Sequence, residues 1–289
     1  RILLGLGVRA QAGKPDLACR ILDPVSQLLL LRVFLLFRLF VFPDHALDSG
    51  APLLGEFYYK GRYPAHLSGE NRYHQRTVAR PGAVRENDAT MRLRRFLKDR
   101  LVPEQVERQM DRIHKMTGSL GYDPWGFNRE AAKIGMALVQ PIYDRWFRVH
   151  SRGEENVPAE GPVLIVANHS GQLPIDGLLI GYTIANRERE PRLPRPMIER
   201  FFPTVPYVGN MLNQLGGVLG DPANCARMLE NGEAITVFPE GVRGSGKLYR
   251  DRYQLKRFGN GFMRLAMAHN ATVVPVGVVG CEETIPAFG

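Results

Sequence analysis

The chain has 289 residues, of which 44% are hydrophobic, and it carries a formal net charge of +9 with a sequence pI near 9.7. This length accommodates one large or two modest domains with a real core, and the composition excludes a disordered chain. The charge points to an anionic partner, such as nucleic acid, an anionic membrane surface or a phosphorylated substrate. Cys19, Cys225 and Cys281 are far apart and form no Cys-x-x-Cys pair, so we expect reduced thiols and no structural zinc.

The first 90 residues differ from the rest of the chain. All nine methionines lie at or beyond Met91, and the chain begins with Arg1. We therefore predict that translation starts at Met91 and that residues 1–90 are upstream sequence without a fold of their own. The alternative is a genuine N-terminal region that is poor in methionine by chance, and mass spectrometry of the natively expressed N-terminus distinguishes the two.

An apolar segment runs from Leu28 to Phe42, but Arg32 and Arg38 interrupt it. Crossing a bilayer takes about 20 apolar residues, and each central arginine costs roughly 2.5 to 3.5 kcal/mol. We therefore expect an interfacial helix with snorkelling arginines rather than a transmembrane span. Residues 42–90 are polar without a sustained period, which indicates a linker or disorder.

Residues 91–150 are predicted to form amphipathic helices. Apolar residues at spacings near three and four between Met91 and Met116 predict two short helices separated by Pro103. Their basic face suits an anionic membrane surface, and packing of the apolar side on the domain is the alternative. Residues 129–149 predict a long helix that bends near Pro141.

Beyond His150, apolar runs and helical patterns alternate. Strands are predicted at 163–167, 196–199, 217–219, 234–238 and 272–279, and helices at 177–186, 207–215, 222–231 and 261–269. Strands separated by helices of this size predict an α/β fold with a mostly parallel sheet flanked by helices. The predicted domain spans residues 151–289, and whether further elements follow Gly289 is left open.

The strand predicted at 163–167 ends in a loop that carries His169. Catalytic side chains tend to lie at such strand ends in open α/β sheets. A neutral imidazole takes a proton from an alcohol, and a carboxylate on its other nitrogen fixes the tautomer, so His169 and Asp176 are candidates for a general base and its partner. The alternative is a histidine bonded to backbone, with Asp176 as a helix N-cap.

The spacing of this pair sets a geometric condition. Seven residues of α-helix would rise about 10 Å, which is too far for a hydrogen bond. We therefore predict that Gly171 and Pro174 fold the loop back, so that the side chains of His169 and Asp176 meet.

A glycine-rich loop, Phe-Pro-Glu-Gly-Val-Arg-Gly-Ser-Gly-Lys at 238–247, follows the strand predicted at 234–238. Its glycines allow a ligand to approach the backbone closely, and Arg243 and Lys247 supply positive charge, so we predict that it binds phosphate or carboxylate. Arg243 is the candidate for bidentate contact, and Glu240 is expected to orient it.

The stretch from Gly241 to Lys247 also fits the Gly-x-x-x-x-Gly-Lys spacing of a P-loop. Leu248 stands where that motif needs a Ser or Thr, and the residues after it make a poor start for a helix that would hold phosphates. Ser245 lacks the Gly-x-Ser-x-Gly elbow of serine hydrolases. A nucleotide hydrolase and a serine hydrolase are therefore disfavoured.

Three motifs, in this order, resemble those of the lysophospholipid and glycerolipid acyltransferases, the superfamily of the 1-acylglycerol-3-phosphate acyltransferases. They are Asn168-His169 with Asp176, Phe238-Pro-Glu-Gly-Val-Arg243, and Val273-Val-Pro-Val276. The resemblance covers about residues 156–286. The stretches 209–220 and 258–262 also resemble the branch with monoacylglycerol and diacylglycerol acyltransferase relatives.

The resemblance implies transfer of a fatty acyl group from acyl-CoA or acyl carrier protein to the hydroxyl of a lysophospholipid, monoacylglycerol or diacylglycerol. It implies that His169 deprotonates this hydroxyl and that Asp176 orients His169. It implies that Glu240, Gly241 and Arg243 line the acceptor site, where Arg243 would hold a phosphate. It requires no metal, no cofactor and no covalent acyl-enzyme. The expected location is peripheral or monotopic on the cytoplasmic face of a membrane, and no nucleic-acid partner is expected.

The sequence departs from the family pattern in two ways. Six residues, rather than four, separate His169 from Asp176, and the basic residue that the family has near Gly216 to Asp221 is not evident. The second departure favours a neutral glyceride or another alcohol over a phosphorylated acceptor. A non-catalytic membrane-surface protein remains as an alternative, followed by a P-loop-like nucleotide binder.

Overall fold

The computed structural model describes residues 3–6, 96, 98–113, 118, 121–171, 173–204, 208–284 and 288. Cys19, the apolar segment 28–42 and the polar stretch 42–90 lie outside the described residues, so the predictions for them stay predictions. Within the described part of the chain, no helix is both long enough and apolar enough to cross a membrane.

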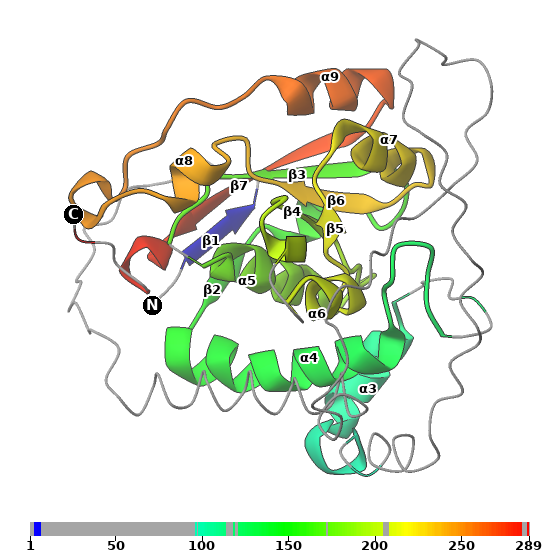
Figure 1. The fold of residues 1–289 in the computed structure, drawn as a ribbon. Coiled ribbons are helices and arrows are strands. Elements are labelled where there is room, and N and C mark those ends of the chain that lie inside the picture. The colour runs from blue at the N-terminus through cyan, green and yellow to red at the C-terminus, as the bar shows by residue number, and fades with distance from the viewer. Residues whose placement is uncertain are drawn as a thin grey trace, which may run out of the picture.

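A seven-stranded sheet with the order β2-β1-β7-β3-β6-β4-β5 lies at the centre of the molecule (Figure 1). The strands are β1 (Leu3–Leu6), β2 (His150–Arg152), β3 (Val163–Ala167), β4 (Arg195–Ile198), β5 (Val218–Leu219), β6 (Ala234–Val237) and β7 (Thr272–Val279). From β7 to β5 each strand is parallel to its neighbours, and the antiparallel pairing among the described strands joins β1 to β7. The predicted α/β fold with a mostly parallel sheet is confirmed.

Two strands extend the sheet beyond the elements expected from the sequence. β1 pairs with β2 in parallel and with β7 in antiparallel orientation. It falls in the segment 1–90, for which the sequence predicted no fold of its own. The rest of that segment lies outside the described residues, so translation from Met91 stays a prediction.

Helices cover both faces of the sheet (Figure 1). They are α3 (Glu104–Asp111), α4 (Arg129–Pro141), α5 (Ile175–Ala185), α6 (Val208–Gln214), α7 (Pro222–Glu230), α8 (Val242–Ser245) and α9 (Gly261–Ala268). Short helical turns follow α4 at η2 (Ile142–Phe147), α8 at η5 (Tyr249–Asp251) and β7 at η6 (Cys281–Glu283). In Figure 1, α7 and α9 lie above the sheet, whereas α4 and α5 lie below it.

Local sequence explains where several helices begin and end. The side chain of Asn128 accepts a hydrogen bond from the backbone N–H of Ala131 at the start of α4, and Asp221 does the same for Asn224 at the start of α7. Pro141 ends the α-helical part of α4, and the chain continues as the π-helix η2. The long helix predicted at 129–149 is therefore α-helical up to Pro141 and π-helical beyond it.

The core consists of two layers on either side of β3, whose five residues are all buried. On one face, Val163 and Ile165 pack with α5 and with the alternate residues of β7. On the other face, Leu164 and Val166 pack with α7 and α9. Burial on both faces explains why β3 is a continuous apolar run.

The apolar side of α3 is part of the domain core. Val106 and Met110 are buried in a cluster with α4 and with Tyr182 and Ala185 of α5. For the basic amphipathic helices, the sequence allowed contact with an anionic membrane surface or packing of the apolar side on the domain. The apolar side of α3 packs on the domain.

A buried ion pair links the helical region to the sheet. Arg195, at the start of β4, is 0% exposed, and its Nη1 donates to Asp123 Oδ2 at 2.6 Å. The other oxygen of Asp123 accepts the backbone N–H groups of Trp125 and Phe127, both at 2.8 Å. Asp123 thus joins the loop before α4 to the amino-terminal end of β4, which lies on the side of the sheet opposite the carboxyl ends of its parallel strands.

Candidate active site

The candidate site centres on His169, which follows the carboxyl end of β3 and is 6% exposed. Its Nδ1 lies 2.6 Å from Oδ2 of Asp176, in the first turn of α5. Since a carboxylate only accepts, Nδ1 carries the proton and donates it. Nε2 is then the basic nitrogen, and it makes no hydrogen bond to any described residue. The predicted contact between the two side chains is confirmed.

The loop between the two residues turns back as its length requires. Gly171 has φ +85°, and a Cβ there would lie 2.8 Å from the carbonyl oxygen of Cys281. A side chain at this position would therefore be strained and would also clash. Asp176 completes the turn, because Oδ2 also accepts the N–H of Ser170 at 3.0 Å and Oδ1 accepts that of Gly177 at 2.8 Å.

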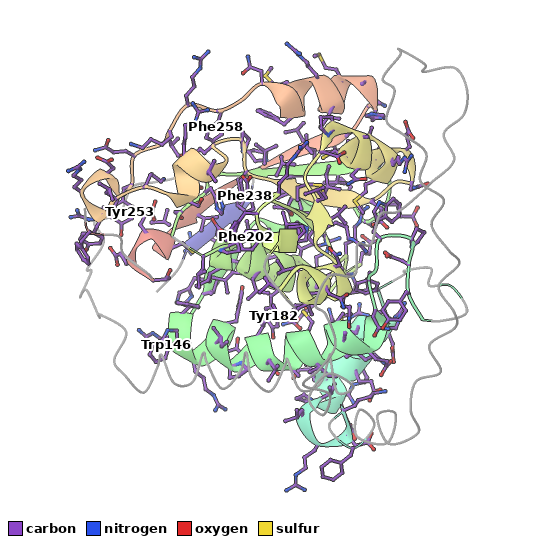
Figure 2. The ribbon with its side chains drawn as sticks, viewed as in Figure 1. Trp146, Tyr182, Phe202, Phe238, Tyr253 and Phe258 are labelled. Carbon is purple, nitrogen blue, oxygen red and sulfur yellow. The ribbon has the colours of Figure 1, made fainter. Side chains whose placement is uncertain are left out.

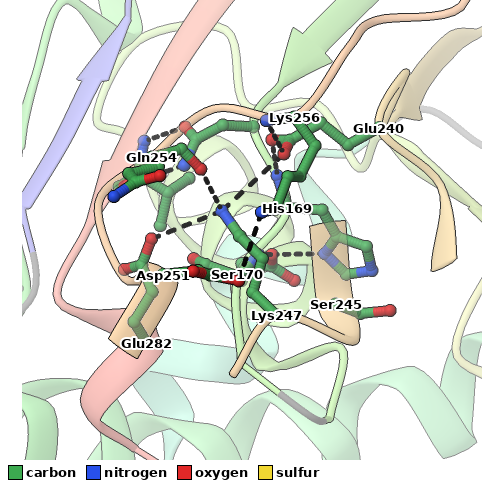
Figure 3. A network of polar contacts seen from close by, with 12 residues as sticks. His169, Ser170, Glu240, Ser245, Lys247, Asp251, Gln254, Lys256 and Glu282 are labelled. Atoms are coloured by element: carbon green, nitrogen blue, oxygen red, sulfur yellow. Dashed lines mark hydrogen bonds and ion pairs between the residues drawn. The ribbon is translucent and has the colours of Figure 1, made fainter. Parts of the chain in front are cut away.

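Glu240 holds this loop from the other side. It is 1% exposed; Oε1 accepts the backbone N–H of His169 at 3.0 Å, and Oε2 accepts that of Lys256 at 2.8 Å (Figure 3). The sequence predicted instead that Glu240 orients Arg243. Both carboxylate oxygens are used to fix backbone, so Glu240 positions His169 and the chain that leads into α9.

Two further residues orient the site, and neither was assigned a role from the sequence. Phe238 stacks on the imidazole of His169, with 4.3 Å between ring centroids. The side-chain amide of Asn168 bonds both the C=O and the N–H of Val278 in β7, at 2.9 and 2.7 Å. Their places in the motifs beside His169 and Glu240 were the signals that could have identified them.

Arg243 and Gly241 lie where the glycine-rich loop enters α8. Gly241 has φ 57° and ψ −152°, a conformation essentially confined to glycine. Arg243 is exposed, and its guanidinium makes no hydrogen bond or ion pair with the described residues. It is therefore open to an anionic ligand. α8 brings it close to His169, since the next residue, Gly244, packs on the Cβ of His169.

Lys247, unlike Arg243, is not open to a ligand. Its side chain is 2% exposed, and Nζ lies 3.7 Å from Oε2 of Glu240 and 3.7 Å from Oε1 of Glu282 (Figure 3). It also donates to the carbonyl of Gln254 at 3.2 Å. The sequence predicted contact with substrate, whereas the structure places this ammonium between buried carboxylates, where it balances their charge.

The glycine-rich loop does not have the geometry of a P-loop. In a P-loop the lysine stands at the start of a helix whose N-terminal N–H groups hold phosphates. Here α8 spans Val242–Ser245 and ends before Lys247, whose ammonium is buried.

Cys281 lies behind the histidine loop and is fully buried. Burial raises the pKa of its thiol, and the nearby carboxylates of Asp176 and Glu282 raise it further. Cys225 is also free and buried, and burial raises the pKa of its thiol to about 11. Both thiols are neutral near pH 7, which disfavours a thiolate nucleophile at either position.

Gly244 makes the close contact between α8 and the histidine loop. A Cβ at this position would lie 2.7 Å from Cβ of Glu240 and 2.8 Å from Cβ of His169. We expect Gly244→Ala to lower the free energy of unfolding by about 1–3 kcal/mol, because neither neighbouring Cβ can move without its backbone. It should also lower activity strongly, since His169 shifts. Urea denaturation and an activity assay measure the two effects.

The matched control is Gly181→Ala in α5, where a Cβ meets nothing within 4 Å. This change should stabilise the protein by about 0.5–1 kcal/mol, because alanine is the better helix former. Equal effects of the two substitutions would show that the contact at Gly244 is not tight.

Residues 148–279 match the family model described as Acyltransferase. An uncharacterized protein of Mycobacterium leprae is 36% identical over 177 residues, which are 60% of this chain and 47% of that protein. An uncharacterized protein of Mycobacterium tuberculosis is 35% identical over 177 residues, 60% of this chain and 49% of that protein. The chain therefore spans about half the length of the curated relatives it matches.

A more distant relative is the "DGAT1/2-independent enzyme synthesizing storage lipids" of Bos taurus, 26% identical over 146 residues. That match covers 50% of this chain and 42% of the bovine protein. Among solved structures, the 1-acyl-sn-glycerophosphate acyltransferase PlsC of Thermotoga maritima aligns with a TM-score of 0.35 and 16% identity. The alignment covers 64% of this chain and 81% of that one.

Proposed function

Because residues 148–279 match the family model described as Acyltransferase, we propose that the protein is a glycerolipid acyltransferase, which transfers a fatty acyl group from a thioester donor to a lipid hydroxyl. The donor is acyl-CoA or acyl carrier protein, and His169 is the general base. The acceptor is a lysophospholipid, a monoacylglycerol or a diacylglycerol.

The observation that carries this proposal is the 2.6 Å contact between His169 Nδ1 and Asp176, which leaves Nε2 unpaired among the described residues. A base needs such a nitrogen within reach of the hydroxyl, and its partner must fix the tautomer. Asp176 and Glu240 hold the residue through the side chain and the backbone respectively. The imidazole is therefore oriented before any substrate arrives.

The reaction moves one proton to His169 and off it again, forms one C–O bond and breaks one C–S bond. The acceptor hydroxyl gives its proton to His169 Nε2 as its oxygen bonds to the carbonyl carbon of the thioester. When the tetrahedral intermediate collapses, the C–S bond breaks and the imidazolium returns the proton to the leaving thiolate. The products are an ester and a free thiol. Asp176 stabilises the imidazolium that exists between the two proton transfers.

The decisive experiment measures thiol release and ester formation by the detergent-solubilised protein. Palmitoyl-CoA and palmitoyl acyl carrier protein are the donors; lysophosphatidate, monoacylglycerol, diacylglycerol and a long-chain alcohol are the acceptors. We expect acceptor-dependent thiol release with equimolar ester formation. Absence of ester with every pair of substrates would contradict the proposal and leave the non-catalytic membrane-surface protein.

Arg243 sets the affinity for a phosphorylated acceptor in this proposal. We expect Arg243→Gln to raise KM for lysophosphatidate by about 10- to 100-fold, because a hydrogen bond to a charged group contributes about 1.5–3 kcal/mol. KM for the neutral alcohol should change little. Steady-state kinetics with both acceptors checks this.

The control is Arg243→Lys, which keeps the charge and loses the fork of two parallel donors. It should recover part of the affinity for lysophosphatidate. If Arg243→Gln weakened both acceptors equally, Arg243 would not be a phosphate contact, and a neutral glyceride would be the better substrate.

A further inference from the structure

A strongly basic segment borders the candidate site. Residues 242–267 contain seven lysines and arginines and one acidic residue, a net charge of +6 out of +9 for the whole chain. Lys247 is buried, and Lys256 forms an ion pair with Asp251 at 3.3 Å. The five arginines of the segment are all exposed: Arg243, Arg250, Arg252, Arg257 and Arg264.

Exposed aliphatic side chains alternate with these arginines. Val242 is 66% exposed, Leu255 68%, Met263 52% and Met267 75%. The segment also has a buried side, on which Phe258, Phe262 and Leu265 pack against the core next to α7 and β6. These four exposed aliphatic residues, together with Tyr253, which is 42% exposed, are therefore additional to those that hold the segment on the domain. We call the exposed residues of this segment the 242–267 surface.

This surface is attached to the residues that hold His169. Gly244 of α8 packs on the Cβ of His169, and the backbone N–H of Lys256 donates to Glu240 at 2.8 Å. The N–H of Gly259 donates to the carbonyl of Pro239 at 2.9 Å. Figure 1 shows α8, the following loop and α9 along one border of the molecule, and Tyr253 and Phe258 lie along that loop in Figure 2.

A purely solvated basic surface accounts for the arginines but not for the aliphatic residues among them. Single-stranded nucleic acid would be held by several aromatic side chains that stack on bases, whereas four of the five exposed large hydrophobic residues here are aliphatic and Tyr253 is the aromatic one. Arginines interleaved with exposed apolar residues match the headgroup layer of an anionic bilayer, where the charges meet lipid phosphates and the apolar groups enter the acyl boundary.

We propose that the 242–267 surface docks the protein on anionic membranes. This inference deepens the proposed function, since docking in this orientation would bring His169 to the layer in which a lipid acceptor presents its hydroxyl. It also assigns membrane contact to a different surface from the basic helices at 91–116, because the apolar side of α3 is buried in the domain.

The test measures sedimentation of the full chain with vesicles of phosphatidylglycerol and phosphatidylcholine, and with vesicles of phosphatidylcholine alone. The triple variant Arg250→Gln, Arg257→Gln and Arg264→Gln should lower the partition coefficient on anionic vesicles about 100-fold. Each arginine near such a surface contributes about 1 kcal/mol, and 1.4 kcal/mol corresponds to a tenfold change. Leu255→Ser with Met263→Ser and Met267→Ser should lower it on the same vesicles while leaving the salt dependence unchanged.

A charge-matched control changes three exposed arginines elsewhere: Arg100→Gln, Arg108→Gln and Arg145→Gln. It should keep vesicle binding within about threefold of the wild type, given the short range of the surface potential. Equal losses in both arginine variants, or unchanged binding in the 242–267 variants, would overturn the proposal. The proposal would also be overturned if a single-stranded oligonucleotide bound more tightly than vesicles and the triple serine variant left both the oligonucleotide binding and the vesicle binding unchanged.

Vesicle binding and catalysis can fail separately. With a short-chain acyl donor and a soluble alcohol in detergent, the arginine variant should retain wild-type turnover, because none of its three residues touches the candidate site. Vesicle binding without turnover in the wild type would reject the proposed reaction and keep the docking surface. Turnover without a binding difference between the variants would reject the surface alone.

Discussion

Replacement of His169 by alanine is expected to lower kcat by about 10²- to 10⁴-fold, the range that a positioned general base contributes. The substitution removes the nitrogen that accepts the proton and leaves Asp176, Glu240 and their backbone contacts in place. KM for the thioester donor should change less than kcat, because the base acts on the acceptor hydroxyl. Release of thiol from palmitoyl-CoA in the presence of the preferred acceptor measures the effect.

The matched control is His150→Ala, which changes an exposed histidine at the start of β2. It should keep activity within about twofold, because surface substitutions away from a site have small effects. The kcat of Asp176→Asn should lie between those of His150→Ala and His169→Ala, since the amide keeps the shape of the side chain and loses the charge that stabilises the imidazolium. More than a tenth of wild-type kcat in His169→Ala would contradict the role of base.

Substitution of Asp123 by asparagine is expected to lower the free energy of unfolding by about 3–5 kcal/mol. The change keeps an oxygen for the N–H groups of Trp125 and Phe127 but leaves the guanidinium of Arg195 buried without its counter-charge. Breaking one half of a buried ion pair has this cost because the remaining charge stays out of water. Urea denaturation, read as a change of midpoint at constant m-value, measures it.

The double variant Asp123→Asn with Arg195→Met is the internal control. Methionine has a similar length and no charge, so we expect the double variant to recover at least half of the loss. The recovery would show that the uncompensated charge causes the instability, rather than the carboxylate itself. A single variant within about 1 kcal/mol of the wild type would mean that water or another group reaches Arg195.

Elements with strong local patterns were predicted closely. β3 and β7 have the predicted ends because each is a β-branched apolar run with turn residues on both sides. α5 begins at Ile175, two residues before the prediction, since Asp176 lies inside its first turn. The strands β1 and β2 were not predicted, because β1 pairs with residues 150–152 and 276–279, which are far along the chain, and a local sequence pattern does not reveal such partners.

The site was predictable where the contact is local and less so where it depends on distant residues. Gly171 and the spacing of His169 and Asp176 indicated a folded-back loop, which the structure has. The partners of Glu240 lie 71 and 16 residues away, so its bond to His169 is a product of the sheet register. Lys247 looked like a ligand contact because sequence charge does not reveal burial.

The shared core of α3, α4 and α5 has a consequence for dividing the protein experimentally. The match to the family model begins at residue 148, but the hydrophobic cluster continues upstream through Val106, Met110 and Met136. A fragment cut at the homology boundary would expose Tyr182 and Ala185 and would also lose the counter-charge of Arg195. Limited proteolysis should therefore spare the described chain between α3 and α5, and the unit that unfolds cooperatively is larger than the unit that sequence comparison detects.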